Sequence, residues 1–577
     1  MNYQQLLSCA LGKEKAPLVL KNANLINVLT GEIYFTDIAI AGAKIIGVGD
    51  YFGREEIDLK GRYVYPGLID GHIHLESSMV SPAEFAAAVL PRGTTTVIAD
   101  PHELANVWGT TGIDYFLKAT ADLPLNVFFT LPSCVPATDL EDSGARLEAE
   151  QLLPYFSHPR VLGLGELMNV PGVLYGDEKV WAKIKAAHQA GKLIDGHAPG
   201  FGDKELMAYR LAGITSDHEC ITAEEATERL RAGMQLMLRE GSASKNLLDL
   251  LPAVTSSNVF QCSLVSDDRH PEDLLNEGHL DHMLRLLVAN KMAPVTALQM
   301  ATVNTARYFR LPDYGAIAPG FRADLVVADD LQSFRPYAVF CGGKLVAKQG
   351  ELIEPIAKNR INTLPQSFNM VQLQASQLKI PAGESQKAWV IGLIPYQIVT
   401  EKLLMEIPVV DGFFEASADR DLAKLMVAER HHQLGSVGLG LLHGFGLKEG
   451  ALASSIAHDS HNLVVVGMGD EDMLLAAQTV AEMGGGLAVV LQGKVLGSLA
   501  LPIGGLMSLE PIDRVAEKLS QLVKLSRGLG IREEYDPFMT LSFLSLPVIP
   551  ELKLTNRGLV DVVQFKHLAI SPDKKGP

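Results

Sequence analysis

Short apolar runs alternate with segments of helical spacing through the middle of this chain. The eight runs are residues 63–74, 94–100, 125–132, 161–166, 192–197, 214–218, 234–240 and 259–268. The amphipathic segment VWAKIKAAHQAG lies between the fourth and fifth runs, and its last residue, Gly191, is expected to end a helix. Eight strand–helix units over roughly 250 residues predict a TIM-like (β/α)8 barrel, in preference to a doubly wound open sheet.

Two β-rich pieces flank this middle segment. Residues 18–50 and 315–354 both alternate apolar and polar residues between Gly, Asn and Asp turn signals. We therefore expect an α/β protein in which residues 1–64 and 313–362 form a small composite β-sandwich domain around a barrel at 65–312. In residues 363–577, β-like runs alternate with helical segments and glycine-rich stretches, which predicts a separate C-terminal α+β domain.

Charge and cysteine usage narrow the classes of function. Acidic residues outnumber basic residues by 67 to 50, which disfavours nucleic acid as an electrostatic partner. The five cysteines form no CxxC pair, which is typical of free thiols in a reducing compartment. No run of eighteen apolar residues occurs, so no membrane span is expected. These observations predict a cytoplasmic protein.

Metal-capable residues follow the predicted barrel strands at the ends where barrel enzymes place their sites. They are His72, His74, Glu166, His197, His218 and Asp267. Each alone has an ordinary structural explanation, as a core histidine, a helix cap or a salt-bridge partner. Together they predict a metal site, since two residues at i and i+2 of a strand, such as His72 and His74, point to the same side.

The predicted ligand set contains four imidazoles and two carboxylates. Nitrogen and oxygen ligands suit Zn, Fe, Mn, Co or Ni, and six of them suit two ions that share a bridging carboxylate. Two such ions activate water as a nucleophile, and a neighbouring carboxylate can move its proton to a leaving group. The pattern therefore predicts metal-assisted hydrolysis.

These residues resemble the signature of the amidohydrolase superfamily, whose first-strand motif is similar to PGLIDGHIHLESS at 66–78. Many members bridge their metals with a carboxylated lysine at strand four, whereas this chain has Glu166 there. Five strings resemble the bacterial adenine deaminase family in particular. They are HIHLESSMVSP (72–82), VIADPHELANVWG (97–109), MLREGSAS (237–244), LVSDDRHPEDL (264–274) and SSIAHDSHN (454–462).

The resemblance covers nearly the whole chain and implies hydrolysis of adenine to hypoxanthine and ammonia. It implies a binuclear divalent metal centre, with Mn²⁺ expected and Fe²⁺ or Zn²⁺ as alternatives. Adenine is the expected small-molecule partner, and we expect a homodimer. Two other functions stay open: an amidohydrolase that opens a cyclic amide such as a hydantoin, dihydropyrimidine or imidazolone, and a non-catalytic metal-dependent purine-binding protein.

The resemblance also implies roles for individual residues. His72 and His74 would bind one ion and His197 and His218 the other, with Glu166 between them and Asp267 as ligand and acid/base. His102 and Glu103 would bind the base or donate a proton, with a loop salt bridge as the alternative. Substrate contacts are expected from Glu76, Arg239, Ser242, Asp268 and His270, although Glu76 also suits a ligand-orienting or capping role and Arg239 a surface pair.

A second group of histidines lies far from the barrel in sequence. His458 and His461 flank Asp459 in a segment predicted to be a loop between strands of the C-terminal domain. Such a loop can close over the barrel mouth, bind a further ion or satisfy its own backbone groups. We favour a closing or structural role.

Overall fold

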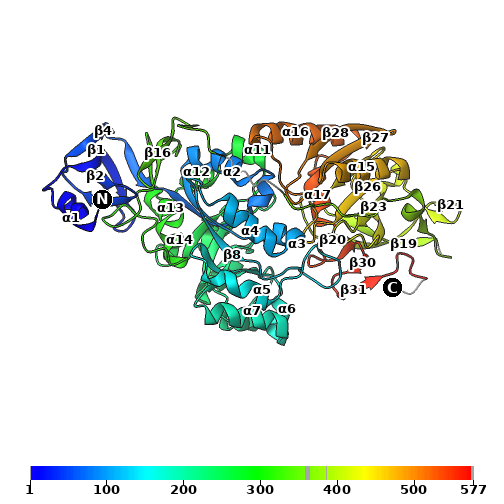
Figure 1. Ribbon diagram of the computed structural model, residues 1–577. Helices are drawn as coiled ribbons and strands as arrows, with labels where there is room; N and C mark the ends of the chain where they lie inside the picture. Colours follow the sequence, from blue (N-terminus) through cyan, green and yellow to red (C-terminus); the bar gives the residue numbers. More distant parts are fainter. Residues whose placement is uncertain (1, 358–363, 385, 574–577) are drawn as a thin grey trace.

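The computed structural model describes residues 2–357, 364–384 and 386–573. Three parts follow one another along the molecule, with the N-terminal sheet at one end, a barrel in the middle and the C-terminal part at the other end (Figure 1). No helix within the described residues has the length and apolar character needed to cross a membrane.

The central part is built on eight strands, which coincide with the eight predicted runs. They are β6 (Leu68–Ile73), β7 (Thr94–Ala99), β8 (Asn126–Leu131), β9 (Val161–Leu167), β10 (Leu193–Gly196), β11 (Ser216–Asp217), β12 (Gln235–Arg239) and β13 (Cys262–Val265). All paired neighbours are parallel, in the orders β10-β9-β8-β7-β6 and β11-β12-β13.

Hydrogen bonds join these two sheets at both seams. The amide of Thr215 donates to the carbonyl of Ile194 at 3.0 Å, which links the β10 and β11 sides. At the other seam, the amide of Asp267 donates to His72 O at 3.0 Å, and the amide of His74 donates to Asp267 O at 3.2 Å. The predicted (β/α)8 barrel is therefore confirmed.

Helices surround the barrel because each follows a strand whose residues are buried on both faces, as parallel sheets require. They are α2 (Pro82–Val89), α3 (His102–Trp108), α4 (Thr110–Ala119), α5 (Ala149–Leu152), α6 (Val170–Tyr175), α7 (Glu178–Gln189), α8 (Asp203–Leu211), α9 (Ala223–Arg231), α10 (Leu247–Leu250), α11 (Pro271–Asn276), α12 (Leu280–Ala289), α13 (Pro294–Met300) and α14 (Val303–Tyr308). In α7 the Asp177 side chain accepts from two amides of the first turn, and Gly191 follows the last turn at φ +65°.

The two β-rich flanks pair in one sheet, preceded by helix α1 (Tyr3–Ala10). Its strands are β1 (Ala16–Asn27), β2 (Glu32–Ala41), β3 (Lys44–Val48), β4 (Gly53–Asp58), β5 (Tyr63–Pro66), β14 (Leu325–Ala328), β15 (Pro336–Cys341), β16 (Lys344–Lys348) and β17 (Glu351–Leu352). The pieces meet where β5 pairs antiparallel with β14. The domain limits proposed from the sequence stay a prediction, and the limit between residues 362 and 363 lies outside the described residues.

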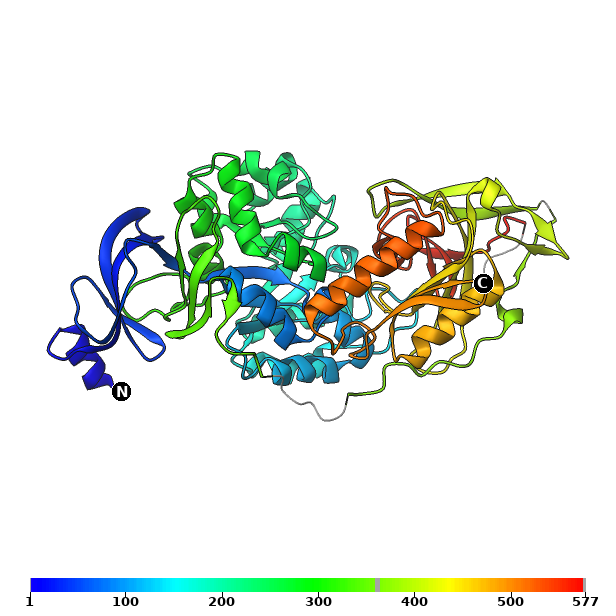
Figure 2. The same cartoon turned by 90° about the horizontal axis from the view of Figure 1, so that it is seen from above.

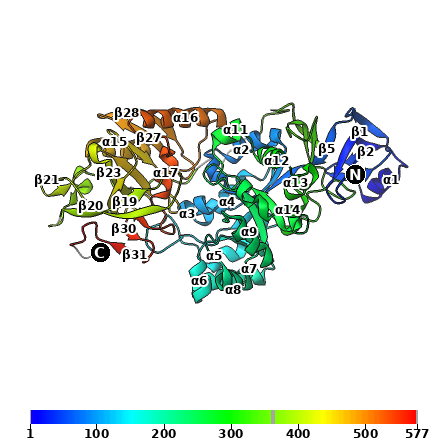
Figure 3. The same ribbon diagram turned by 180° about the vertical axis from the view of Figure 1, so that it is seen from behind.

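The C-terminal part has an eight-stranded sheet in the order β20-β19-β24-β23-β26-β25-β27-β28 (Figure 3). These strands are β19 (Lys387–Leu393), β20 (Thr400–Glu406), β23 (Leu422–Ala428), β24 (Val437–His443), β25 (Ala451–Ser454), β26 (Leu463–Gly467), β27 (Gly486–Leu491) and β28 (Lys494–Ala500). Its helices are α15 (Asp470–Glu482), α16 (Ile512–Gly528) and α17 (Pro537–Phe543). Two small three-stranded sheets complete this part. The first contains β18 (Ile380–Pro381), β21 (Val409–Val410) and β22 (Phe413–Phe414), and the second contains β29 (Leu552–Thr555), β30 (Gly558–Asp561) and β31 (Lys566–Leu568).

The C-terminal part packs against the end of the barrel where the strands finish. Seen from above, α16 extends from the C-terminal sheet toward the barrel, where it packs on α11 (Figure 2). The segment after β8 also reaches across, and Asp142 forms an ion pair with Arg557 and accepts from Asn556 Nδ2 at 2.6 Å. One continuous hydrophobic core contains residues of both parts. The barrel mouth is therefore covered by the C-terminal part.

Candidate metal centre

Two histidines at the end of β6 face the carboxylate at the end of β9. His72 and His74 lie two residues apart, so both side chains point into the barrel mouth. Their Nε2 atoms lie 3.1 and 2.8 Å from Glu166 Oε1 and 3.3 Å from each other. The strand alternation expected from the HxH motif thus brings two imidazoles to one carboxylate oxygen.

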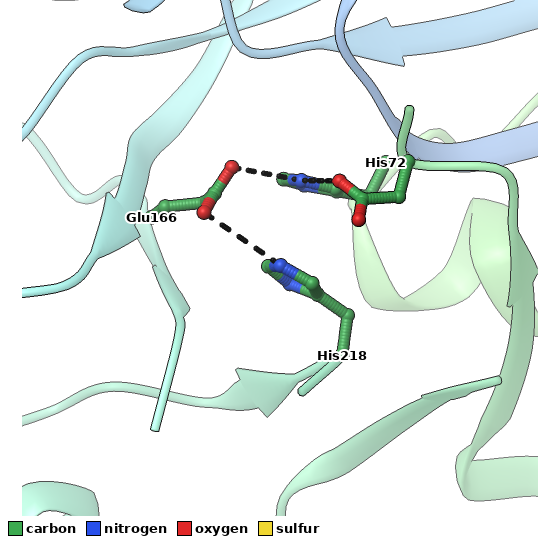
Figure 4. A group of neighbouring side chains, drawn as sticks. His72, Glu166 and His218 are labelled. Atoms are coloured by element: carbon green, nitrogen blue, oxygen red, sulfur yellow. Dashed lines mark hydrogen bonds and ion pairs between the residues drawn. The ribbon is translucent and has the colours of Figure 1, made fainter. Parts of the chain in front are cut away.

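The second oxygen of Glu166 faces the other pair of histidines. His197, which follows β10, has Nδ1 2.8 Å from Glu166 Oε2, and His218, which follows β11, has Nε2 3.6 Å from the same atom. Figure 4 shows the carboxylate between the imidazoles of His72 and His218, with one oxygen directed at each. Glu166 therefore lies between two histidine pairs.

Asp267 completes this cluster from the end of β13. Its Oδ1 lies 3.1 Å from His74 Nε2 and 3.6 Å from His72 Nε2, while its Oδ2 accepts from Arg239 Nη1 at 3.0 Å. The backbone of Asp267 is left-handed, at φ 56°, a conformation that Asp adopts more readily than most residues. All six predicted ligands meet at one point, and only the His197 side chain, 22% exposed, is reachable from solvent to a sizeable degree.

Outer hydrogen bonds fix the first histidine pair. His72 Nδ1 donates to Asp195 Oδ2 at 3.0 Å, and His74 Nδ1 donates to the carbonyl of Asp100 at 3.0 Å. In the neutral imidazoles, both Nε2 lone pairs then point toward each other and toward Glu166. In that state three acceptors face one another, and a cation between them would pair with all three.

The charges of the cluster lead to the same conclusion. Burial alone would raise the pKa of Glu166, but the facing histidines, His74 foremost, hold it well below its ordinary value. Burial likewise opposes ionisation of Asp267, yet His74 and Arg239 hold its pKa well below the usual range. Burial lowers the pKa of His72, whereas Asp195 and Glu166 raise it well above normal overall. Two ionised carboxylates therefore require compensating positive charge, which bound divalent cations supply by displacing protons.

The donor set fits divalent metal ions. His72, Glu166, His218 and Asp267 each offer one ligand atom, and these four atoms lie within 4.8 Å of one another. Imidazole nitrogens and carboxylate oxygens are the ligands that transition-metal ions of hydrolytic enzymes prefer. The cluster therefore fits a divalent metal site.

Two further acidic residues belong to the site although the sequence reasoning did not select them. Asp195, on β10, accepts a hydrogen bond from His72 Nδ1. Its place two residues before His197 is a sequence signal that could have identified it. Glu219 Oε1 lies 3.3 Å from His218 Nε2 and 3.7 Å from His197 Nδ1, and its carboxylate pairs with Arg239. Glu219 follows a predicted ligand directly, which gives no periodic signal of its own.

A pocket adjoins the cluster between the barrel and the C-terminal part. Its barrel side is lined by Glu76, Ser77, Met79, Glu103, Ala243, Asp268 and His270, and its C-terminal side includes Ile456, His458, Leu487, Leu506, Phe538 and Phe543. A carboxylate oxygen of Asp268 lies within 4.8 Å of the ligand atoms of His74 and Asp267, so Asp268 adjoins both the pocket and the cluster. Burial raises the pKa of Glu76 to about 7.

Of the remaining predicted site residues, one faces the cluster, four line the pocket and two lie outside the pocket lining. His102 faces the cluster, with Nδ1 3.7 Å from Asp100 Oδ1 and 3.8 Å from Glu166 Oε1. Glu76, Glu103, Asp268 and His270 line the pocket. Arg239 and Ser242 do not line it: Arg239 is ion-paired with Glu219 and Asp267, and the Ser242 hydroxyl donates to Asp273 and accepts from the His270 amide.

Comparison with known proteins decides the family. Residues 63–346 match the amidohydrolase family, and residues 397–566 match the adenine deaminase C-terminal domain. Adenine deaminase 2 of Carboxydothermus hydrogenoformans is 56% identical over 571 residues, which cover 98% of this chain and 99% of that protein. The chain belongs to the adenine deaminase family.

Other members of the adenine deaminase family align over a similar extent. The adenine deaminase of Desulfatibacillum aliphaticivorans is 47% identical, with 98% of this chain and 99% of that protein covered. That of Kosmotoga olearia is 46% identical, with both chains fully covered. Among solved structures, a β-aspartyl dipeptidase of Fervidobacterium islandicum AW-1 covers 58% of this chain and 98% of its own at 19% identity, with a TM-score of 0.45. The full-length relatives confirm the family resemblance found in the sequence.

Proposed function

We propose that this chain is an adenine deaminase, a hydrolase that converts adenine and water to hypoxanthine and ammonia (EC 3.5.4.2). The observation that carries the proposal is the buried cluster in which Glu166 lies between two histidine pairs. The cluster adjoins a pocket lined by residues of the barrel and of the C-terminal part. Near-full-length similarity to proteins named adenine deaminase supports the choice of substrate.

The predicted ligands divide into two sets. His72 and His74 are proposed to hold one ion, His197 and His218 the other, with Glu166 and Asp267 completing the centre. When bound, a pair of divalent cations supplies Lewis acidity and lowers the pKa of water enough for it to act as a nucleophile near neutral pH. We propose Mn²⁺ as the native ion, as the resemblance to the adenine deaminase family implies, with Fe²⁺ or Zn²⁺ as alternatives that the same nitrogen and oxygen donors accept.

The protein's own groups then move protons and orient the base. Asp267, held by Arg239, is placed to take a proton from the attacking water and return it to the departing amino group. The C6–NH2 bond breaks, a C6–O bond forms, and the ring nitrogen next to C6 receives the other proton of the water. Glu103 lines the pocket and is proposed to hydrogen-bond that nitrogen, while His102 supports the cluster and Glu76, Asp268 and His270 contact the base.

Three predictions from the sequence accompany this proposal. Arg239 and Ser242 remain predicted substrate contacts, and Arg239 is better placed to orient Asp267 than to touch a ring nitrogen. All five cysteines are free and buried, in keeping with the proposed cytoplasmic location. The proposed homodimer stays a prediction.

Ammonia release from adenine tests the function directly. We expect purified protein reloaded with Mn²⁺ to release ammonia and hypoxanthine in equal amounts, and metal-stripped protein to release neither. Glu166→Gln is expected to lose at least about a thousandfold in kcat, since it removes the charge that joins the two ion positions. The exposed Glu150→Gln is the matched control and should behave as wild type. Metal-loaded protein that releases no ammonia but opens cyclic amides would refute adenine as the substrate, and ligand binding without turnover would support the purine-binding alternative.

A further inference from the structure

The C-terminal part contributes one imidazole to a pocket wall that is otherwise made of apolar side chains and two serines, Ser454 and Ser542. His458 is half-buried and lines the pocket beside Ile456 and Leu487, whereas the following residues 459–462 are buried. Its imidazole stacks on Phe543, with ring centroids 4.7 Å apart and planes inclined by 28°. The ring therefore faces the barrel with one side supported by an aromatic neighbour.

The loop that presents His458 is firmly held. The amide of His458 donates to Ser542 O at 2.9 Å, and the amide of His461 donates to Ala457 O at 2.7 Å. The fully buried guanidinium of Arg430 donates to His461 O and, at 2.9 Å, to Gly504 O. A side chain on a loop fixed at both ends keeps its direction with little loss of conformational entropy on binding a ligand.

Neither ring nitrogen of His458 has a hydrogen-bond partner among the described residues. Burial lowers the pKa of His458, and the carboxylates of Asp268 and Asp459 offset this only in part, so a neutral imidazole is favoured. A neutral imidazole offers one donor and one acceptor. A ligand in the pocket with complementary groups would pair both nitrogens.

A third metal ion is the first alternative, because ligand atoms of Glu103, His458 and His461 lie within 4.8 Å of one another. The hydrogen bonds of His461 argue against it. Its Nδ1 accepts from the Ala457 amide at 3.2 Å, so in the neutral ring the proton is on Nε2, which lies 3.6 Å from Glu103 Oε2. A nitrogen that carries a proton offers no lone pair to a cation.

We propose that His458 is a purine-contacting residue of the deaminase site, acting beside Glu103 on the same ligand. This inference rests on the proposed function, since it assigns the residue to the same substrate. A purine presents ring-nitrogen acceptors and an N–H donor at neighbouring positions of one flat ring, which matches a neutral imidazole and a carboxyl group that lie side by side. The C-terminal part thus takes part in recognition of the base.

Two substitutions distinguish the contribution of the His458 ring nitrogens to binding from that of the packing of the ring. His458→Phe keeps a flat ring against Phe543 but removes both nitrogens, and His458→Ala removes the ring. We expect each to raise KM for adenine, and the Kd for hypoxanthine measured by calorimetry, by about tenfold or more, as loss of a hydrogen bond in a dry pocket does. His443→Ala, on β24 and outside the pocket lining, is the matched control and is expected to keep wild-type values.

The outcomes distinguish the two proposals. Failure of the wild-type protein to deaminate adenine would refute the proposed function itself. Normal wild-type turnover, with KM and Kd of His458→Phe within twofold of wild type, would overturn only the role of His458. Loss of a third equivalent of metal per chain in His458→Phe would overturn it too, because the group would then be an ion site. Should His458→Ala fail to fold, His458→Phe still gives the answer.

Discussion

Asp195 illustrates how a residue outside the ligand set controls the metal centre. It is buried on β10, and its Oδ2 accepts the Nδ1 proton of His72, which leaves Nε2 free to face Glu166. Partners of this kind set the tautomer and the direction of a ligating imidazole.

We therefore expect Asp195→Ala to lower metal affinity or kcat/KM by about 10- to 100-fold while the fold is retained. Metal titration and adenine turnover measure the two quantities, and circular dichroism checks the fold. Asp122→Ala, at an exposed position, serves as the control. Unchanged affinity and turnover in Asp195→Ala would show that His72 needs no such support.

Residue patterns predicted the ligand positions but not their partners. His72 and His74 follow from strand alternation, and Glu166 and Asp267 from their place after predicted strands. Asp195 has a local signal in its place two residues before His197, but its contact with His72 spans 123 residues, and periodicity carries no information about such a pair. Periodicity likewise does not predict the ion pairs that Arg239 forms with Glu219 and Asp267.

At the level of elements, β9 shows why small residues occur inside the barrel. A Cβ at Gly165 would lie 2.0 Å from Asp100 Oδ2, the atom that accepts from the Glu166 amide at 3.0 Å. Glycine therefore allows the end of β7 to hold the backbone at Glu166. The sequence predicts all eight strands by their apolar runs, yet the packing inside the barrel depends on neighbours that only the closed sheet brings together.

Gly165→Ala is expected to displace Asp100 and shift Glu166, and to lower kcat/KM by about a hundredfold, as misplacement of a catalytic group by about 1 Å does. Steady-state kinetics with adenine measure this effect. Gly469→Ala, where a Cβ meets nothing within 4 Å and φ is −144°, is the matched control. Wild-type kinetics in Gly165→Ala would mean that the strand adjusts without moving Glu166.

At the level of the whole molecule, the segment after β8 attaches the C-terminal part to the barrel. Asp142 pairs with Arg557, accepts from Asn556 and, through its carbonyl, from Asn462 Nδ2 at 2.7 Å. The sequence indicated an additional C-terminal domain but not this attachment, since its partners lie more than 300 residues apart.

Asp142→Ala is expected to lower the free energy of unfolding by about 1–2 kcal/mol, a value reduced from that of a fully buried pair because both side chains are partly exposed. Thermal unfolding and hydrogen exchange of residues 454–462 measure the loss. Asp139→Ala breaks the local surface pair with Arg146 on the same segment, and a change below about 0.5 kcal/mol is expected there. Equal effects of the two substitutions would mean that the contact does not fasten the two parts.

The order of the parts along the chain also sets the order in which the ribosome delivers them. The last barrel ligand, Asp267, emerges long before Phe543 of the pocket wall, so at ~5–20 residues per second the metal cluster stays uncovered for about 10 to 50 seconds. During that interval no C-terminal wall separates the histidines from the surrounding solution. A cluster that formed during this interval would meet ions with no such wall in the way.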